Sequence, residues 1–176
     1  MGTHIISGLA IAVALTGGWT DWRSRRLPNW LTVSGFSAGL AANAILGGWP
    51  GVKTSLLGAG AMLLVLLPVV LLRGLGAGDW KLMGALGAIV GWDQIGYILF
   101  AAILLAGAIA IAQMIRQRRV LATLVNLWEL VCGFFILGLR PHPEMNLDNP
   151  AATTLPFGVA VAAATVFCCV AIFGRV

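Results

Sequence analysis

Long apolar segments separated by short polar breaks dominate the chain. Hydropathy and the positions of these breaks predict about six membrane spans. The expected spans cover roughly 4–20, 30–47, 54–73, 80–92, 94–113 and 155–173. A helix needs about 20 predominantly apolar residues to cross a bilayer, and several of these segments approach that length. The pattern therefore predicts an all-α integral membrane protein.

The expected fourth span is short. Its sequence, WKLMGALGAIVGW, would not cross a full bilayer upright. Either its flanks extend it, or neighbouring helices shield it around a wet cavity. Small residues here and in the earlier stretch SGFSAGLAANA allow membrane helices to approach closely, and we interpret them mainly as packing residues.

Composition agrees with a membrane protein. Of 176 residues, 60% are hydrophobic and only 10% are charged, whereas soluble domains have about 25% charged residues. We expect a single membrane domain over 1–176. The first segment lacks a basic n-region and a small-residue cleavage site, so we interpret it as a retained span. The cysteines and histidines lack the spacing of a disulfide framework or a metal site, and we expect the cysteines to be packing residues.

Basic residues lie mostly on one side of the expected spans. If the loop after the first span is cytoplasmic, that side holds Arg23, Arg25, Arg26, Arg73, Lys81, Arg116, Arg118, Arg119 and Arg140. The opposite side keeps Lys53 and Arg175. Because Lys and Arg of short loops accumulate on the cytoplasmic side, this bias predicts that both chain ends lie outside. The net charge of +5 is then a topology signal, and we infer no nucleic-acid partner.

The segment 122–139 allows two interpretations, because it is apolar enough for a seventh span but carries Asn126 and Glu129. A seventh span would move the last helix and Arg175 to the inside. We favour an interfacial or re-entrant helix within a long cytoplasmic loop, 114–154. The following stretch, RPHPEMNLDNPAATTLP, is typical of an exposed connector.

Six acidic residues are present: Asp21, Asp79, Asp93, Glu129, Glu144 and Asp148. Asp93 falls in a turn on the outer side, and two others lie in the polar connector, where water solvates them. An acid at the edge of hydrocarbon is costly unless it is solvated, paired or protonated. Asp21 ends the first span and Asp79 begins the fourth on the same side. The expected topology therefore places these two carboxylates at one depth, where they can meet.

Two carboxylates at one site have a specific chemical use. When they approach closely, they share one proton and titrate as a unit. The ionised member can take a proton from water while the protonated member polarises a peptide carbonyl, as in aspartic proteases. No metal, nucleophilic serine or cofactor is required. Structural interpretations stay open, because Asp79 could cap the fourth helix and Asp21 could pair with a neighbouring arginine as a topology anchor.

Three stretches resemble motifs of the type IV prepilin peptidases. DWRSRRLPNWLT, residues 21–32, is similar to the first motif, an acid followed by basic residues and a hydrophobic-Pro-Asn turn. GAGDWKLMGALGAIVG, residues 76–91, resembles the second, GxGD with a lysine two positions on. LPFGVAVAAA, residues 155–164, resembles the start of the family's last helix. The order and spacing also resemble the family's, over essentially the whole chain.

The resemblance implies a GxGD-type membrane aspartic endopeptidase with Asp21 and Asp79 as the catalytic pair. It implies removal of the short basic leader of type IV prepilins or pseudopilins at the cytoplasmic face of the bacterial inner membrane. Larger family members carry an N-terminal region with two CxxC pairs and also methylate the new N-terminus. This sequence lacks such a region and resembles the short form of tight-adherence (Flp) pili, so we expect peptidase activity without methylation. The expected partners are the prepilin and membrane lipid, and pilus assembly machinery is a further candidate.

Further residues of these motifs are expected to shape the site. Gly76 and Gly78 have no Cβ, so the backbone beside Asp79 can bend and an extended substrate strand can approach it. Pro28 fixes a turn, and its missing N–H suits the first turn of the second span, with Asn29 hydrogen-bonding nearby.

The basic residues of the motifs allow more than one role. Lys81 could tune the acid two residues before it or contact substrate, but we favour a positive-inside anchor. Arg26, which we also place at the site, would repel a basic leader together with Arg23 and Arg25, unless the acids or lipid head groups screen them. Glu129 could supply attraction to the leader.

Two other function classes stay open. A small transporter or channel could use the two acids to bind a cation or relay protons. Against it, both acids lie at one face rather than at the midplane, and no inverted repeat is evident. A scaffold for a pilus assembly machine would need the glycine-rich helices only for packing. Presenilin-like and signal-peptide-peptidase-like enzymes share the GxGD pattern, but the LPN motif favours prepilins.

Overall fold

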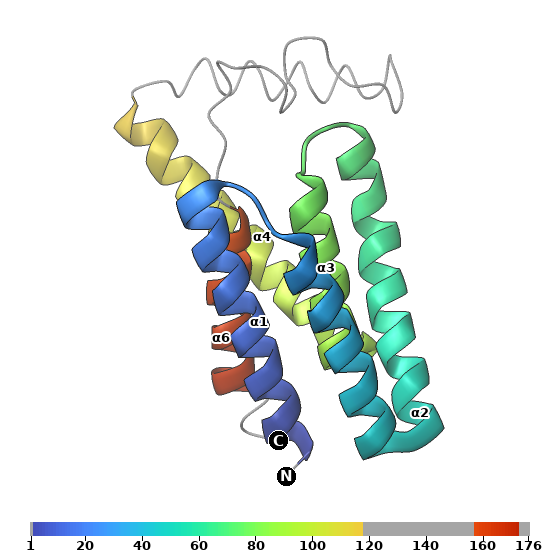
Figure 1. The fold of residues 1–176 in the computed structure, drawn as a ribbon. Coiled ribbons are helices and arrows are strands. Elements are labelled where there is room, and N and C mark those ends of the chain that lie inside the picture. Colours follow the sequence, from blue (N-terminus) through green and yellow to red (C-terminus); the bar gives the residue numbers. More distant parts are fainter. Residues whose placement is uncertain (1, 118–156, 173–176) are drawn as a thin grey trace.

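The described part of the chain is a bundle of helices (Figure 1). The computed structural model describes residues 2–117 and 157–172. Its elements are α1 (Gly2–Ser24), α2 (Asn29–Leu71), α3 (Ala77–Val90), α4 (Trp92–Arg116), α6 (Phe157–Phe167) and the π-helical η1 (Cys168–Ile172), which continues α6. These ranges contain no strand. Since α1, α2 and α4 are long and apolar enough to cross a membrane, the prediction of an all-α membrane protein is confirmed.

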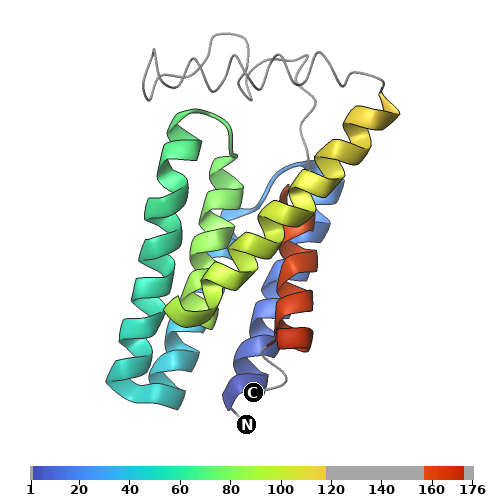
Figure 2. The same ribbon diagram turned by 180° about the vertical axis from the view of Figure 1, so that it is seen from behind.

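The long helix α2 contains a reversal of the chain. Gly48 has φ 58° and ψ −142°, in the left-handed region that glycine adopts at no steric cost. The two arms of α2 on either side of Gly48 run back alongside each other (Figures 1 and 2). They correspond to the expected spans 30–47 and 54–73. The number of membrane spans stays a prediction, and residues 118–156 lie outside the described part.

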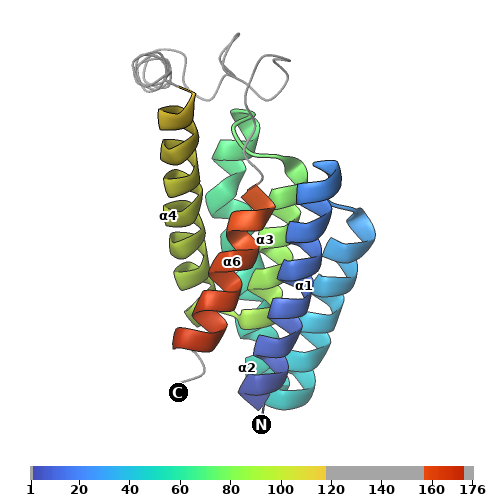
Figure 3. The ribbon, with the colours of Figure 1, turned by 90° about the vertical axis from the view of Figure 1, so that its left-hand side faces the viewer.

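The core of the bundle is built around α3. Every residue in 82–90 is buried, although successive residues of a helix point in all directions around its axis. The helices α1, α2, α4 and α6 all contact α3 (Figure 3). With 14 residues, α3 is only about 21 Å long. The sequence left two explanations open for this short apolar segment. The structure favours shielding by neighbouring helices.

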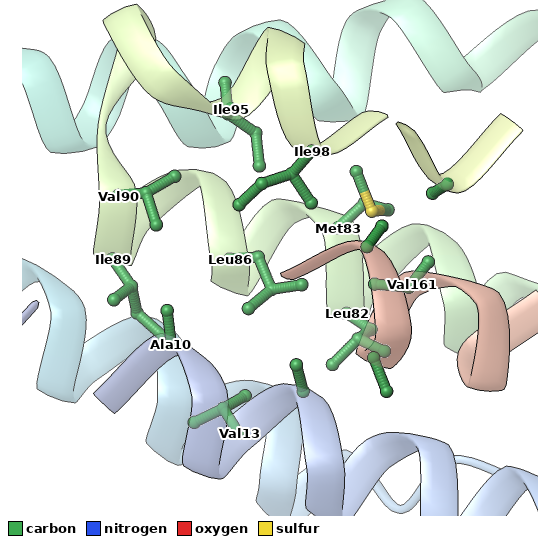
Figure 4. Packing of buried hydrophobic residues seen from close by; sticks show 14 of the residues in the cluster. Ala10, Val13, Leu82, Met83, Leu86, Ile89, Val90, Ile95, Ile98 and Val161 are labelled. Atoms are coloured by element: carbon green, nitrogen blue, oxygen red, sulfur yellow. The ribbon is translucent and has the colours of Figure 1, made fainter. Parts of the chain in front are cut away.

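Apolar side chains from α1, α2, α3, α4 and α6 fill the core, and Figure 4 shows part of it. The labelled members are Ala10 and Val13 of α1, Leu82, Met83, Leu86, Ile89 and Val90 of α3, Ile95 and Ile98 of α4, and Val161 of α6. Cys168 and Cys169 are buried in the same cluster, as expected of packing residues, whereas Cys132 lies outside the described residues. The core thus fixes the distances between α3, α1 and α6, on which the site depends.

Close backbone packing joins α2 to α3. A Cβ atom on Gly58 would overlap the carbonyl oxygen of Gly87, and one on Gly87 would overlap that of Gly58. Near the C-terminal end of α3, the carbonyl oxygen of Ala88 accepts hydrogen bonds from Asn43 Nδ2 (3.0 Å) and Ser55 Oγ (2.6 Å). Helix ends leave carbonyls without intrahelical partners, and these side chains supply partners there.

The two ends of the bundle differ in charge. The α1–α2 and α2–α3 connections and the C-terminal end of α4 lie at one end (Figure 1), with Arg23, Arg25, Arg26, Arg73 and Arg116. We call this the basic end. At the other end, Lys53 is the one Lys or Arg among the described residues. Exposed tryptophans lie near both ends of the bundle. Trp19, Trp22 and Trp30 lie near the basic end, and Trp49 and Trp92 lie near the other end. Tryptophan is enriched at both membrane–water interfaces, so this distribution fits a bundle embedded in a membrane.

Candidate active site

Asp21 and Asp79 reach one pocket from two different helices. Asp21 lies in the last turn of α1, and Asp79 lies in the first turn of α3. Both line a pocket of about 350 Å³ at the basic end. The sequence placed these two acids at one depth, and the structure brings them to one site. Two carboxylates are thereby held beside a space that a substrate backbone can enter.

The pocket wall comes from two stretches of chain. The end of α1 and the loop after it contribute Asp21, Arg25, Arg26 and Leu27. The start of α3 contributes Gly76, Ala77, Gly78 and Asp79. Arg26 and both glycines were expected at the site, whereas Leu27 and Ala77 were not. Both residues lie within the motif stretches, but an apolar side chain carries no chemical signal of its own, so the sequence did not single these two out.

Pro28 and Asn29 form the start of α2 beside the pocket. Pro28 has φ −71° and ψ 137° and precedes the first helical residue, and its carbonyl oxygen accepts a hydrogen bond from the N–H of Leu31 (3.1 Å). Its fixed φ and missing N–H suit this position. Asn29 Oδ1 accepts a hydrogen bond from Lys81 Nζ at 2.9 Å. Lys81 therefore links the N-terminal part of α3 to the first turn of α2, and its role as a positive-inside anchor stays a prediction.

Gly76 and Gly78 make room around Asp79. Gly76 has φ −66° and ψ 140°, which any residue can adopt, so the expected freedom to bend is not what this position requires. A Cβ atom on Gly76 would lie 3.2 Å from Asp79 Oδ2. A Cβ atom on Gly78 would lie 2.9 Å from the Cβ atom of Leu27. The absent side chains thus let the Leu27 loop and the Asp79 carboxylate lie directly against this backbone.

Asp79 carries an unsatisfied oxygen. Within residues 2–117 and 157–172, its Oδ1 atom is buried and has no hydrogen-bond partner. The N-cap residue of α3 is Gly76, and Asp79 lies three residues on, in the first turn of the helix. Leaving a buried polar atom unpaired costs free energy. Asp79 lines the pocket, and an unpaired buried atom on such a residue is consistent with a catalytic role.

Asp21 is held by a different set of neighbours. The residue is 7% exposed, and its Oδ2 atom accepts a hydrogen bond from the backbone N–H of Gly158 in α6 at 2.9 Å. Arg25, four residues on, attracts its carboxylate electrostatically. The anchor interpretation of Asp21 therefore coexists with its place in the pocket. Gly158 was missed as a site residue, although the stretch LPFG that contains it resembles the start of the family's last helix.

Two expectations find no test at this site. Glu129 lies outside the described residues. In the part of the chain that the structure describes, no three His, Cys, Asp or Glu side chains gather where a metal ion could bind.

Comparison with known proteins assigns the chain to a family. Residues 8–111, which include Asp21 and Asp79, match the type IV leader peptidase family. The chain belongs to this family. Among curated proteins, it is similar to the prepilin leader peptidase/N-methyltransferase of Escherichia coli (strain K12), with 34% identity over 131 residues. That match covers 69% of this chain and 58% of the relative. No solved structure matches this leader peptidase family member significantly.

Proposed function

We propose that this member of the type IV leader peptidase family is a membrane aspartic endopeptidase that removes the leader peptide of type IV prepilins or pseudopilins. The observation that carries the proposal is the meeting of Asp21 and Asp79 in one pocket. The buried oxygen of Asp79, unpaired within the described residues, supports a role in chemistry. The name of the Escherichia coli relative, prepilin leader peptidase, supports the substrate class.

The proposed reaction uses the pair as one acid and one base. The ionised carboxylate takes a proton from a water molecule, whose oxygen attacks the carbonyl carbon of the scissile peptide bond. The protonated carboxyl donates a hydrogen bond to the carbonyl oxygen and stabilises the charge that develops there. Collapse of the tetrahedral intermediate breaks the C–N bond, and the leaving nitrogen takes up the proton that the base carboxyl took from water. Both carboxyl groups then return to their starting states.

The position of the pocket suits a substrate that lies half in water and half in lipid. A basic leader stays in water, while the apolar helix that follows it stays in the bilayer. The scissile bond between them lies at the level of the interface. The pocket lies at the basic end, near the exposed Trp19, Trp22 and Trp30, which supports cleavage at that level. The positive-inside bias favours the cytoplasmic face of the inner membrane, with both chain ends outside.

Two finer features of the substrate reaction follow from the resemblance alone. A Flp-type prepilin is the predicted substrate, and the mature N-terminus is predicted to stay unmethylated. Mass spectrometry of processed pilin tests the second prediction, because a methyl group adds a fixed mass to the N-terminal residue.

Co-expression with a Flp-type prepilin from the same genome tests the proposed function. Leader removal is followed by gel shift and N-terminal sequencing for the wild type, Asp21→Asn and Asp79→Asn. We expect cleavage by the wild type and none by either variant at equal amounts in the membrane, because asparagine can neither take up nor supply the proton.

Asp93→Asn is the matched control. Asp93 is an exposed acid in the first turn of α4, at the other end of the bundle, and its replacement should leave cleavage unchanged. Continued processing by both Asp21→Asn and Asp79→Asn would rule out the aspartic mechanism.

A further inference from the structure

The first turn of α6 reaches the carboxylate of Asp21 from the far end of the sequence. Gly158 is the second residue of α6, and its N–H donates a buried hydrogen bond to Asp21 Oδ2 across 137 positions of sequence. Backbone N–H groups at a helix N-terminus carry partial positive charge, which favours an anion there. An oxygen that accepts from an N–H offers a lone pair to it, so this contact favours the ionised form of Asp21.

There is no space for a side chain at this contact. A Cβ atom on Gly158 would lie 2.9 Å from both Cβ and Oδ2 of Asp21. Cβ of Asp21 is fixed by the α1 backbone and cannot swing away as the tip of a long side chain could. One turn earlier on α1, a Cβ atom on Gly18 would lie 2.7 Å from that of Ala162. Helices α1 and α6 are therefore in close contact at the hydrogen bond and one turn away from it.

The two acids of the pocket differ in their hydrogen bonding. Asp21 has the N–H of Gly158 and the nearby positive charge of Arg25. Asp79 faces Asp21 in the same pocket, and its buried Oδ1 has no hydrogen-bond partner within the described residues. A negative charge is better stabilised where donors and a cation surround it. A proton on a carboxyl group reduces the cost of leaving it without donors.

We propose that Gly158 is a positioning residue that holds Asp21 as the ionised, water-activating member of the pair and leaves the proton on Asp79. The assignment rests on the proposed function, since it divides the base and acid roles of that reaction. Asp79 then donates to the carbonyl oxygen of the scissile bond. The closeness of α1 and α6 makes the position of α6 part of the catalytic geometry.

Gly158→Ala tests the positioning role with purified full-length protein and a prepilin substrate. The added Cβ atom displaces the Asp21 carboxylate, and small misplacements of a reacting group cost up to about 100-fold in rate. We expect kcat to fall by roughly 10- to 100-fold with KM within about twofold of the wild type, because substrate binding does not use this contact. Gly60→Ala is the control, since nothing lies within 4 Å of a Cβ atom on Gly60, and it should keep wild-type kinetics. Wild-type kcat in Gly158→Ala would overturn the positioning role.

Infrared spectroscopy tests the assignment of the proton without any substrate. The carbonyl stretch of a protonated carboxyl group is compared between reconstituted wild type, Asp21→Asn and Asp79→Asn at neutral pH. We expect the band in the wild type and its disappearance in Asp79→Asn, where Asp21 is the remaining acid of the pair. Its persistence in Asp79→Asn would show that Asp21 holds the proton and would overturn the assignment. A wild type that fails to cleave prepilin would instead refute the proposed function, so the two failures are distinguishable.

Discussion

At the scale of single residues, the hydrogen bond between Lys81 Nζ and Asn29 Oδ1 joins the two motifs that flank the pocket. Asn29 is the last residue of the LPN motif, and Lys81 lies two residues beyond Asp79. Neither residue lines the pocket, so both act on it through the backbone that they connect. Both side chains are exposed, so water competes for the bond and its contribution is modest.

Breaking this bond from either side should have the same effect. We expect Asn29→Ala and Lys81→Met each to lower kcat/KM by about 2- to 10-fold, the range of an ordinary hydrogen bond. The double variant should be no worse than either single variant, because the second change removes a partner that is already lost. Steady-state kinetics of the three variants measure this, and independent, multiplying losses would contradict the link.

The acids could be predicted from the sequence and the glycine could not. Asp21 and Asp79 stand out because a carboxylate next to hydrocarbon is costly unless something compensates for it. Gly158 contributes a backbone N–H, a group that every residue except proline has. A glycine in the sequence therefore indicates at most that a neighbouring group packs closely against the backbone. It does not indicate which group that is.

At the scale of elements, the helix boundaries follow from the sequence but the neighbours of each helix do not. The polar breaks predicted α1, both arms of α2 and α4 to within a few residues. Hydropathy gives the depth of a residue in the membrane and carries no information on which helices lie side by side. That α3 is enclosed by four other helices, and that α6 lies against Asp21, therefore emerged only from the structure.

The contact between α2 and α3 offers a test of element packing. Gly58→Ala should destabilise the protein by about 1–3 kcal/mol, because its Cβ atom would overlap the backbone of α3 at Gly87. Gly60→Ala, two positions along the same helix and facing open space, should not destabilise it. Thermal unfolding in detergent compares the two variants, and equal stability would show that the close approach is not needed.

At the scale of the whole molecule, basic residues and exposed tryptophans distinguish the two ends of the bundle, and the pocket lies at the basic end. Arg25 and Arg26 line the pocket itself, and Trp22 and Trp30 lie exposed close by in sequence. Trp49 and Trp92 are exposed at the opposite end. We propose that the basic end faces the cytoplasm, because Lys and Arg accumulate there in membrane proteins.

Cysteine labelling tests this orientation in a background whose three native cysteines are replaced by alanine. Ser24→Cys introduces an exposed thiol at the basic end, and Gly47→Cys introduces one at the other end. A membrane-impermeant maleimide should label Ser24→Cys in inside-out vesicles but not in spheroplasts, and Gly47→Cys in the reverse pattern. Labelling with the sides exchanged would contradict the proposed orientation.

The central claim, that Asp21 and Asp79 act as one catalytic pair, is tested most directly by kcat/KM of purified wild type, Asp21→Asn, Asp79→Asn and the double variant on prepilin. Residues that act as a unit show strongly non-additive losses, so each single variant should lose roughly ten-thousand-fold and the double variant no more than a few-fold beyond that. A single variant within about tenfold of the wild type, or a double variant whose loss is the product of the two single losses, would contradict the pair.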